Sequence, residues 1–171
     1  AAEANASVTV FVGATSVGSG GVVSGAWSIT TSTLADGVAS VTARATDLAG
    51  NQSAASAALA ITVDTVAPSP PSTPDLDPLS DSGVSNTDDI TNDPTPTIRG
   101  SAETGATVTA SGASAVVGTA TATGGAWAIT TSPLTDGIES VSARATDLAG
   151  NQSTVSSSLS LTIDTVAPAT P

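Results

Sequence analysis

The sequence predicts an all-β protein made of two tandem β-sandwich domains, joined by an acidic, proline-rich linker. Three observations support this fold class. The chain repeats itself at a fixed spacing, which is typical of tandem domains. Short runs rich in Val, Ile and Thr lie between Gly, Asp-Gly and Pro, as strands lie between turns. Within these runs apolar and polar residues alternate, which indicates strands with one buried and one solvated face.

The internal repeat has an offset of 100 residues. The stretch 43–53 recurs letter for letter at 143–153, and Trp27 and Trp127 each follow a Gly-Ala pair. The closing motif Asp-Thr-Val-Ala-Pro begins at Asp64 in the first copy and at Asp164 in the second. The chain therefore contains two related domains of ordinary size.

The first copy lacks a counterpart of residues 75–100, because Ala2-Glu3 aligns with Ala102-Glu103. Residues 1–67 are predicted to form a repeat without its first strand, and residues 68–93 a proline-rich linker with an acidic calcium-binding segment. Residues 94–171 are predicted to form the second repeat, with the full repeat unit at about 75–167. Truncation is the simpler explanation for the missing strand. Donation of that strand by another molecule is the alternative.

Six strands are expected in the second copy: 95–100, 107–111, 116–121, 127–131, 139–145 and 155–163. In one of them Val141, Ala143 and Ala145 alternate with polar residues and should face the core. Six or seven short strands in a repeat of this length are typical of an immunoglobulin-like sandwich. We expect Trp27 and Trp127 in the two cores; exposure as sugar-stacking platforms is the alternative, although Phe11 is the only other aromatic residue.

Composition excludes several classes of function. The chain has 15 acidic residues against three arginines, a formal net charge of −12, and neither His nor Cys. Zinc sites, thiol chemistry and a Ser-His-Asp triad are therefore excluded. Nucleic acid and anionic membranes are unfavourable partners for so negative a chain. No apolar run approaches the roughly 18–20 residues of a membrane span. We also expect no enzymatic activity, since glycoside hydrolysis by paired carboxylates would need a cleft with aromatic platforms.

The strongest candidate site is the acidic segment 75–93, which follows a run of prolines. Calcium binds six to eight oxygens from carboxylates and backbone carbonyls, and Asp77, Asp81 and Asp88 could surround such an ion. In an immunoglobulin-like sandwich the first strand starts at the end that carries the loop before the last strand, here 146–151. The segment, Asp64 and Asp147 should then converge between the repeats. The alternative is a solvated acidic linker without metal.

Several motifs resemble bacterial immunoglobulin-like repeats from the extender regions of giant secreted adhesins, of the biofilm-associated and repeats-in-toxin kind. The opening motifs are Ser-Asp-Ser-Gly at 80–83, Asp-Asp-Ile-Thr-Asn at 88–92 and Pro-Thr-Pro-Thr-Ile-Arg-Gly-Ser-Ala-Glu at 94–103. The closing motifs are Ala-Thr-Asp-Leu-Ala-Gly-Asn at 145–151 and Ile-Asp-Thr-Val-Ala-Pro at 163–168. The resemblance covers essentially the whole chain.

The resemblance implies type I secretion to the bacterial cell surface, many tandem copies, and calcium at the domain junctions. It points to the metal ligands Asp64, Asp77, Asp81, Asp88 and Asp147. The expected function is a non-catalytic, calcium-rigidified spacer that projects an adhesive domain during cell adhesion and biofilm formation. Its partners would be calcium ions and adjacent repeats, and the fragment itself should be monomeric.

Two competing functions stay open at this point. A subunit of a self-assembling surface filament or sheath would exchange strands between chains and would therefore be oligomeric. A carbohydrate-binding module of a secreted enzyme would instead present an exposed aromatic side chain to its ligand.

Overall fold

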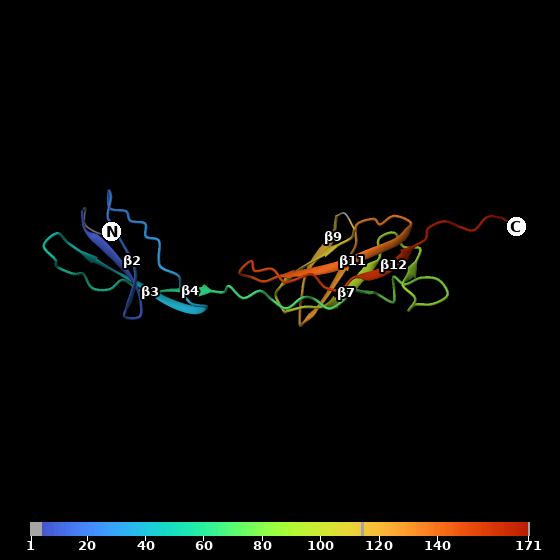
Figure 1. Cartoon of the computed structure of the whole chain (residues 1–171), viewed down its shortest axis with the longest axis horizontal. Coiled ribbons are helices and arrows are strands. Elements are labelled where there is room, and N and C mark those ends of the chain that lie inside the picture. Colours follow the sequence, from blue (N-terminus) through green and yellow to red (C-terminus); the bar gives the residue numbers. More distant parts are fainter. Residues whose placement is uncertain (1–4, 114, 171) are drawn as a thin grey trace. The chain divides into compact units, whose positions relative to one another are not determined.

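A computed structural model describes residues 5–113 and 115–170, which form two compact units, Ala1–Thr65 (unit 1) and Val66–Pro171 (unit 2). Every regular element in these residues is a strand (Figure 1). The strands of unit 1 are β1 Ser7–Val12, β2 Thr15–Gly21, β3 Gly37–Thr46 and β4 Leu59–Val63. Those of unit 2 are β5 Asp75–Leu76, β6 Ile90–Thr91, β7 Thr97–Ser101, β8 Thr107–Ser111, β9 Val116–Thr121, β10 Ala126–Thr130, β11 Gly137–Thr146 and β12 Leu159–Ile163.

Unit 2 is a two-layer sandwich, as the sequence predicts. One sheet has the order β10-β7-β5 and the other the order β6-β12-β11-β8-β9. The core between them combines Ile98 and Trp127 of the first sheet with Val108, Val141 and Leu161 of the second. The apolar positions of β11 and β12 that the alternation assigns to the interior are all buried, whereas Arg144 is exposed.

All six strands expected in this repeat are present, although β12 begins later than the pattern indicates. The chain before it is held to β11 by Ser153 and Ser156, which bond through both their backbone amides and their side chains, rather than by a regular ladder. The Ser153 Oγ accepts a hydrogen bond from the Ala145 amide at 3.0 Å, and the Ser156 Oγ accepts one from the Ala143 amide at 2.9 Å. Because these hydroxyls replace backbone carbonyls, residues 153–158 run beside β11 without forming a strand.

The stretch predicted as a linker, 68–93, contributes to unit 2. It contains β5, which pairs antiparallel with β7, and β6, which pairs parallel with β12. Pro71 and Leu76 within it are buried. Both strands are only two residues long, so neither produces the alternation that identifies a strand in sequence.

Unit 1 consists of a single sheet, with the order β2-β1-β3-β4, in the residues that the structure describes. Its small core contains Ala6, Val8 and Val22, with Ile29 and other partly buried residues packed against them. The prediction of a core tryptophan is confirmed for Trp127, which is 4% exposed. It is wrong for Trp27, which is 45% exposed. Trp127 lies on β10 and pairs with Gly100 of β7, whereas among the described residues of unit 1 no strand pairs with the segment that contains Trp27.

Candidate metal site

The acidic loop, defined as residues 77–93, connects β5 to β7 and is folded tightly at its start. The Asp77 carbonyl accepts hydrogen bonds from the amides of Ser80 at 2.8 Å and Asp81 at 2.9 Å. The Asp77 carboxylate accepts another from the Leu79 amide at 2.9 Å. An aspartate that bonds to the amide two residues on is a typical turn former, so local hydrogen bonding fixes this part of the loop.

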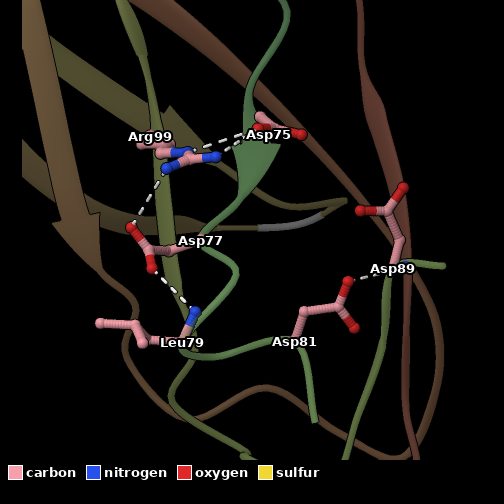
Figure 2. A network of polar contacts seen from close by, with 6 residues as sticks. All are labelled: Asp75, Asp77, Leu79, Asp81, Asp89 and Arg99. Carbon is pink, nitrogen blue, oxygen red and sulfur yellow. Dashed lines mark hydrogen bonds and ion pairs between the residues drawn. The ribbon is translucent and has the colours of Figure 1, made fainter. Parts of the chain in front are cut away.

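Arg99 neutralises part of the negative charge at the start of the loop. It projects from β7 between two carboxylates, with its Nη2 3.2 Å from Asp75 Oδ2 and its Nη1 3.7 Å from Asp77 Oδ2 (Figure 2). These side chains are partly exposed, so the ion pairs add little stability. Asp77, a predicted ligand, therefore already has a cationic partner.

Asp81 is the most unusual acidic residue of the loop, because it is only 6% exposed. Its Oδ2 accepts a long hydrogen bond, 3.4 Å, from the Asp89 amide. Its Oδ1 is buried and has no hydrogen-bond partner in the part of the chain that the structure describes. A buried carboxylate oxygen without a partner is costly unless a proton or a cation compensates it.

Asp89 lies beside Asp81, and Figure 2 shows the Asp81 carboxylate turned toward it. Its backbone has a φ of 59°, in the left-handed region, where aspartate is one of the few tolerated side chains. Burial raises the pKa of the Asp89 carboxyl, and the negative charges of Asp75, Asp81 and Asp88 raise it further. The carboxylates are therefore close enough to repel one another.

Asp88, a predicted ligand, is exposed and accepts a 3.4 Å hydrogen bond from the Ile90 amide. Sequence reasoning did not select Asp89, although it follows Asp88 directly. A left-handed residue that turns the chain back toward Asp81 leaves no pattern in the sequence, so the pairing of Asp81 with Asp89 emerges only from the fold.

Asp147 does not join the acidic loop. It follows the last residue of β11. The acidic loop lies at the other end of this strand, because β6, inside the loop, pairs with Ile163 of β12, and Ile163 pairs with the first residue of β11. The ten residues of β11 separate these two ends by about 30 Å. Figure 1 shows the loop after β5 and the loop after β11 at opposite ends of unit 2.

The expected convergence fails because the first strand of the sandwich is β5 and not 95–100. The chain enters β5 from Ser72, whose amide bonds to the Ser101 carbonyl at the Asp147 end, and reaches the acidic loop only after crossing the domain. The first strand does start at the end that carries the Asp147 loop. Because that strand is β5, the acidic loop that follows it lies at the opposite end of the domain.

The Asp147 side chain stabilises its own loop. It accepts hydrogen bonds from the Ala149 amide at 2.9 Å, the Asn151 amide at 2.8 Å and the Asn151 side chain at 2.9 Å. The side-chain bond from Asn151 is the main reason that the pKa of Asp147 is lowered. Asp47 has the same bonds in unit 1.

Asp64, the remaining predicted ligand, directly follows β4 in unit 1. Its counterpart in unit 2 does lie at the end that carries the acidic loop, since the Asp164 amide bonds to the Thr91 carbonyl at 2.9 Å. Within unit 2 the structure thus brings together Asp77, Asp81, Asp88 and Asp89 at the end where the chain leaves the domain.

The donor set fits a calcium ion only with the help of backbone oxygens. Among the described residues, no three acidic side chains are close enough together to hold a metal ion by themselves. Asp81 offers an unpartnered carboxylate oxygen and Asp89 offers a second carboxylate. Calcium accepts carbonyl oxygens readily and tolerates an irregular arrangement of ligands, whereas magnesium demands a near-ideal octahedron.

Neither tryptophan is a built sugar platform. Trp127 borders an open pocket of about 590 Å³ that is also lined by Asp75, Arg99 and Thr121. Its ring, however, is buried in the core and cannot stack on a ligand. Trp27 is half-exposed, and among the residues described for unit 1 no strand takes the place that β7 has beside Trp127.

A family model described as bacterial Ig-like domain matches residues 1–65 and 67–165. One similar solved structure is "Biofilm associated protein - BSP domain", with a TM-score of 0.39 and 21% identity, where the match covers 96% of this chain and 26% of the other. Another is "Structures of Clostridium thermocellum CbhA fibronectin(III)-like modules", with a TM-score of 0.51 and 18% identity, covering 94% of this chain and 78% of the other. The second likeness shows the fold alone. No curated protein matches the chain, and none of its described residues form a helix long and apolar enough to cross a membrane.

Proposed function

The chain belongs to the bacterial Ig-like domain family, and we propose that it is a non-catalytic extender segment of a bacterial cell-surface adhesin. In this role it acts as a spacer that projects an adhesive domain from the cell for adhesion and biofilm formation, after export by a type I system. The high negative charge suits a long exposed rod, because it keeps neighbouring copies soluble and apart.

Calcium is the proposed stabiliser of this spacer. The observation that carries the proposal is Asp81, a carboxylate that is 6% exposed, with one oxygen unpartnered among the described residues and a second carboxylate, Asp89, beside it. A cation would relieve both the desolvation and the mutual repulsion. An ion that binds only the folded loop stabilises the fold, and extracellular modules bind calcium with dissociation constants of about 10⁻⁴–10⁻³ M.

The location of the loop suggests which joint calcium would stiffen. The acidic loop lies at the end of unit 2 where the chain leaves through Asp164. In a tandem array this is the end that faces the next repeat. The ion would therefore rigidify the exit of each repeat, and Asp147, at the opposite end, would take no part.

Calorimetric titration of chelator-treated protein with calcium tests the proposal, with magnesium as the control ion. We expect calcium to bind and to slow amide hydrogen exchange in residues 80–92. Asp81→Asn and Asp89→Asn should abolish binding without lowering stability in chelator, since each removes a repulsive buried charge.

Asp147→Asn is the matched control, because it removes an equal charge at the far end of the same unit and should leave calcium binding intact. Loss of binding in Asp147→Asn, or undiminished binding in Asp81→Asn, would contradict this site. Absence of any calcium binding would mean that the acidic residues only solubilise the loop.

A further inference from the structure

A carboxylate holds the chain at the point where it leaves each unit. In unit 1 the Asp36 carboxylate accepts hydrogen bonds from the Thr65 amide at 2.9 Å and from the Thr65 hydroxyl at 3.0 Å. In unit 2 the Asp136 carboxylate accepts the same bonds from Thr165, at 2.9–3.0 Å. We call each of these pairs an exit clamp. Because the clamp occurs in both units, it belongs to the repeat itself.

The exit clamp extends the hold of the sheet on the departing chain. Gly37 starts β3 with a φ of 115°, a conformation that favours glycine, and it pairs with Val63, the last residue of β4. Asp36 therefore lies beside the end of β4, and its side chain reaches Thr65, two residues further on. Hydrogen bonds to an ionised carboxylate are roughly twice as strong as neutral ones. Thr65 is thus fixed to unit 1 although the ladder between β3 and β4 has already ended.

Soon after Thr65 the chain becomes buried again. In the proline segment, defined as residues 68–74, Pro68, Pro71 and Pro74 are buried, whereas the residues between them are exposed. A burial period of three residues is the period of a polyproline II helix, which is extended and semi-rigid. One side of the proline segment is therefore covered along its whole length.

Ser72 fastens the proline segment to β7 of unit 2. Its amide donates a hydrogen bond to the Ser101 carbonyl at 2.9 Å, and its Oγ accepts one from the Ser101 amide at 2.9 Å. Gly100 gives this side chain room, because a Cβ added there would lie 2.7 Å from the Ser72 Oγ. β5 follows the segment and pairs with the same strand. The proline segment is thus an ordered part of unit 2.

The cover over Pro68 comes from unit 2 and not from the unit that precedes it. The residues Val-Ala-Pro follow Thr65 and Thr165 alike. Pro168 comes after unit 2 as Pro68 comes after unit 1, yet Pro168 is exposed and Pro68 is buried. The unit before such a proline therefore does not bury it. Packing of the proline segment on unit 2, to which residues from Val66 onward belong, accounts for the difference.

We propose that the exit clamp of unit 1 and the proline segment together stiffen the connection between the units without a metal ion. The clamp fixes Thr65 to unit 1 and packing fixes Pro68 to unit 2, so only residues 66 and 67 lie between two anchored positions. The pyrrolidine ring locks the φ of Pro68, and its bulk keeps Ala67 out of helical conformations. Bending is therefore confined to very few backbone dihedral angles. Calcium at the acidic loop would act in addition to this device and not through it.

The exit clamp acts on orientation rather than on folding stability. Asp36 and Thr65 are both exposed, so water can replace their hydrogen bonds when the clamp is removed. What is then lost is the fixed direction of the chain that leaves β4. Removal of the clamp should therefore widen the range of orientations that unit 2 samples, while both units stay folded.

The test compares Asp36→Ala with Asp136→Ala in the full chain, in excess chelator. Asp136→Ala is the matched control, because it removes an identical clamp that lies after unit 2 and outside the connection. The chain has no cysteine, so Ser40→Cys and Ser140→Cys place one spin label on an exposed strand position of each unit. Pulsed electron paramagnetic resonance then measures the distribution of distances between the two labels.

We expect Asp36→Ala to broaden the distance distribution and Asp136→Ala to leave it unchanged. Amide hydrogen exchange at Thr65 should accelerate roughly tenfold or more in Asp36→Ala, as expected for the loss of a hydrogen bond to a charged group. Thr65→Val keeps the amide bond and loses the hydroxyl bonds, so it should give a smaller effect in both measurements. Pro68→Gly should also broaden the distribution, because it releases Ala67 and removes the first packed ring.

An unchanged distribution in Asp36→Ala would overturn the proposal, and so would equal broadening in Asp136→Ala. A distribution in the parent chain that is already broad in chelator and narrows only after calcium is added would also overturn it, because the stiffness would then come from the metal. Every variant is measured in chelator, so failure here leaves the proposed calcium site untouched. A failure of calcium to bind at Asp81 would equally leave the exit clamp untouched.

Discussion

Units 1 and 2 share long identical stretches, but the same residues are buried in one and exposed in the other. Trp27 is 45% exposed and Trp127 is 4% exposed, although each follows Gly-Ala. The loops that close the two units have the same hydrogen bonds around Asp47 and Asp147. Among the described residues, the two units differ on the face on which β5 and β7 pack in unit 2, and at the edge of β12, where β6 pairs in unit 2 and no strand lies beside β4. Local sequence thus decides loops and hairpins, whereas burial depends on whether a partner strand is present.

The largest expected effect is on the two tryptophans. Trp127→Ala should destabilise unit 2 by about 3–5 kcal/mol, because it empties a close-packed core. Trp27→Ala should cost unit 1 less, about 2 kcal/mol, since nearly half of that side chain is already in water. Chemical denaturation of the full chain, followed by residue-resolved NMR in each unit, measures the two effects separately.

Similar losses in both units would contradict the comparison, because they would mean that unit 1 has a complete core in solution.

A smaller difference is expected at a matched pair of glycines on β2 and β9. A Cβ at Gly118 would collide with the Ile129 Cγ2, and a Cβ at Gly18 would lie 2.8 Å from the Ile29 Cγ2 and 2.9 Å from the Thr30 carbonyl oxygen. Ile129 is 3% exposed and lies on a strand paired with β7. Ile29 is only partly buried against the small core of unit 1, and residues 27–31 belong to no strand, so Ile29 and the Thr30 carbonyl can shift more easily. Gly118→Ala should therefore cost about 1–3 kcal/mol and Gly18→Ala clearly less.

Thermal unfolding monitored in each unit checks this pair. Gly21→Ala serves as the control, because an added Cβ there meets nothing within 4 Å. If Gly18→Ala costs as much as Gly118→Ala, the segment 27–31 is as rigid as β10, although it belongs to no strand.

Ser153 and Ser53 form the next pair. Each Oγ accepts a 3.0 Å hydrogen bond from the alanine amide of the preceding strand, Ala145 or Ala45. Ser153 is buried and Ser53 is exposed. Ser153→Ala should cost about 1–3 kcal/mol, because it leaves a buried amide without its partner, whereas water can replace the hydroxyl in Ser53→Ala.

Amide hydrogen exchange at Ala145 and Ala45 reports this difference directly. Exchange should accelerate strongly at Ala145 in Ser153→Ala and only slightly at Ala45 in Ser53→Ala. Equal acceleration would mean that water reaches both serines, and the two units would then not differ at this position.

The fold was predictable from sequence where each element carries its own pattern. The alternation of Val141, Ala143 and Ala145 identifies β11, and the Gly-Asn turn after Asp147 identifies the loop that follows it. β5 and β6 were not predictable, because two-residue strands in a run of prolines and aspartates have no period. Missing β5 also displaced the expected site, since that strand carries the acidic loop to the far end of the domain.

The candidate site was predictable in its composition but not in its geometry. The density of aspartates in 75–93 indicates the loop, and Asp77, Asp81 and Asp88 do lie in it. Which carboxylate is buried depends on packing. Asp81 is enclosed and Asp88 is exposed, although nothing in the sequence distinguishes them. Asp89 gains its position from a left-handed backbone that is visible only in three dimensions.

The smallest expected effect is the pH dependence of folding stability, which has one sign at Asp47 and Asp147 and the opposite sign at Asp89. Hydrogen bonds from Asn51 and Asn151 lower the pKa values of Asp47 and Asp147 below the usual 3.8. A lowered pKa in the folded state contributes stability above the unfolded value, and that contribution disappears as the pH falls through the folded pKa. Both units should therefore lose stability in this acid range, and Asn51→Ala and Asn151→Ala should weaken the loss by similar small amounts.

The Asp89 carboxyl, in unit 2, changes the pH dependence of stability in the opposite direction. Burial raises its pKa above 3.8, so its ionisation removes stability as the pH rises from that value through the folded pKa. Asp89→Asn should abolish this pH-dependent loss, and calcium should reduce it, because a bound cation favours the ionised form. NMR titration of the aspartate carboxylates checks both signs. A lowered pKa at Asp89 without calcium would mean that the loop has its own compensating charge, and the reason for placing a metal there would be lost.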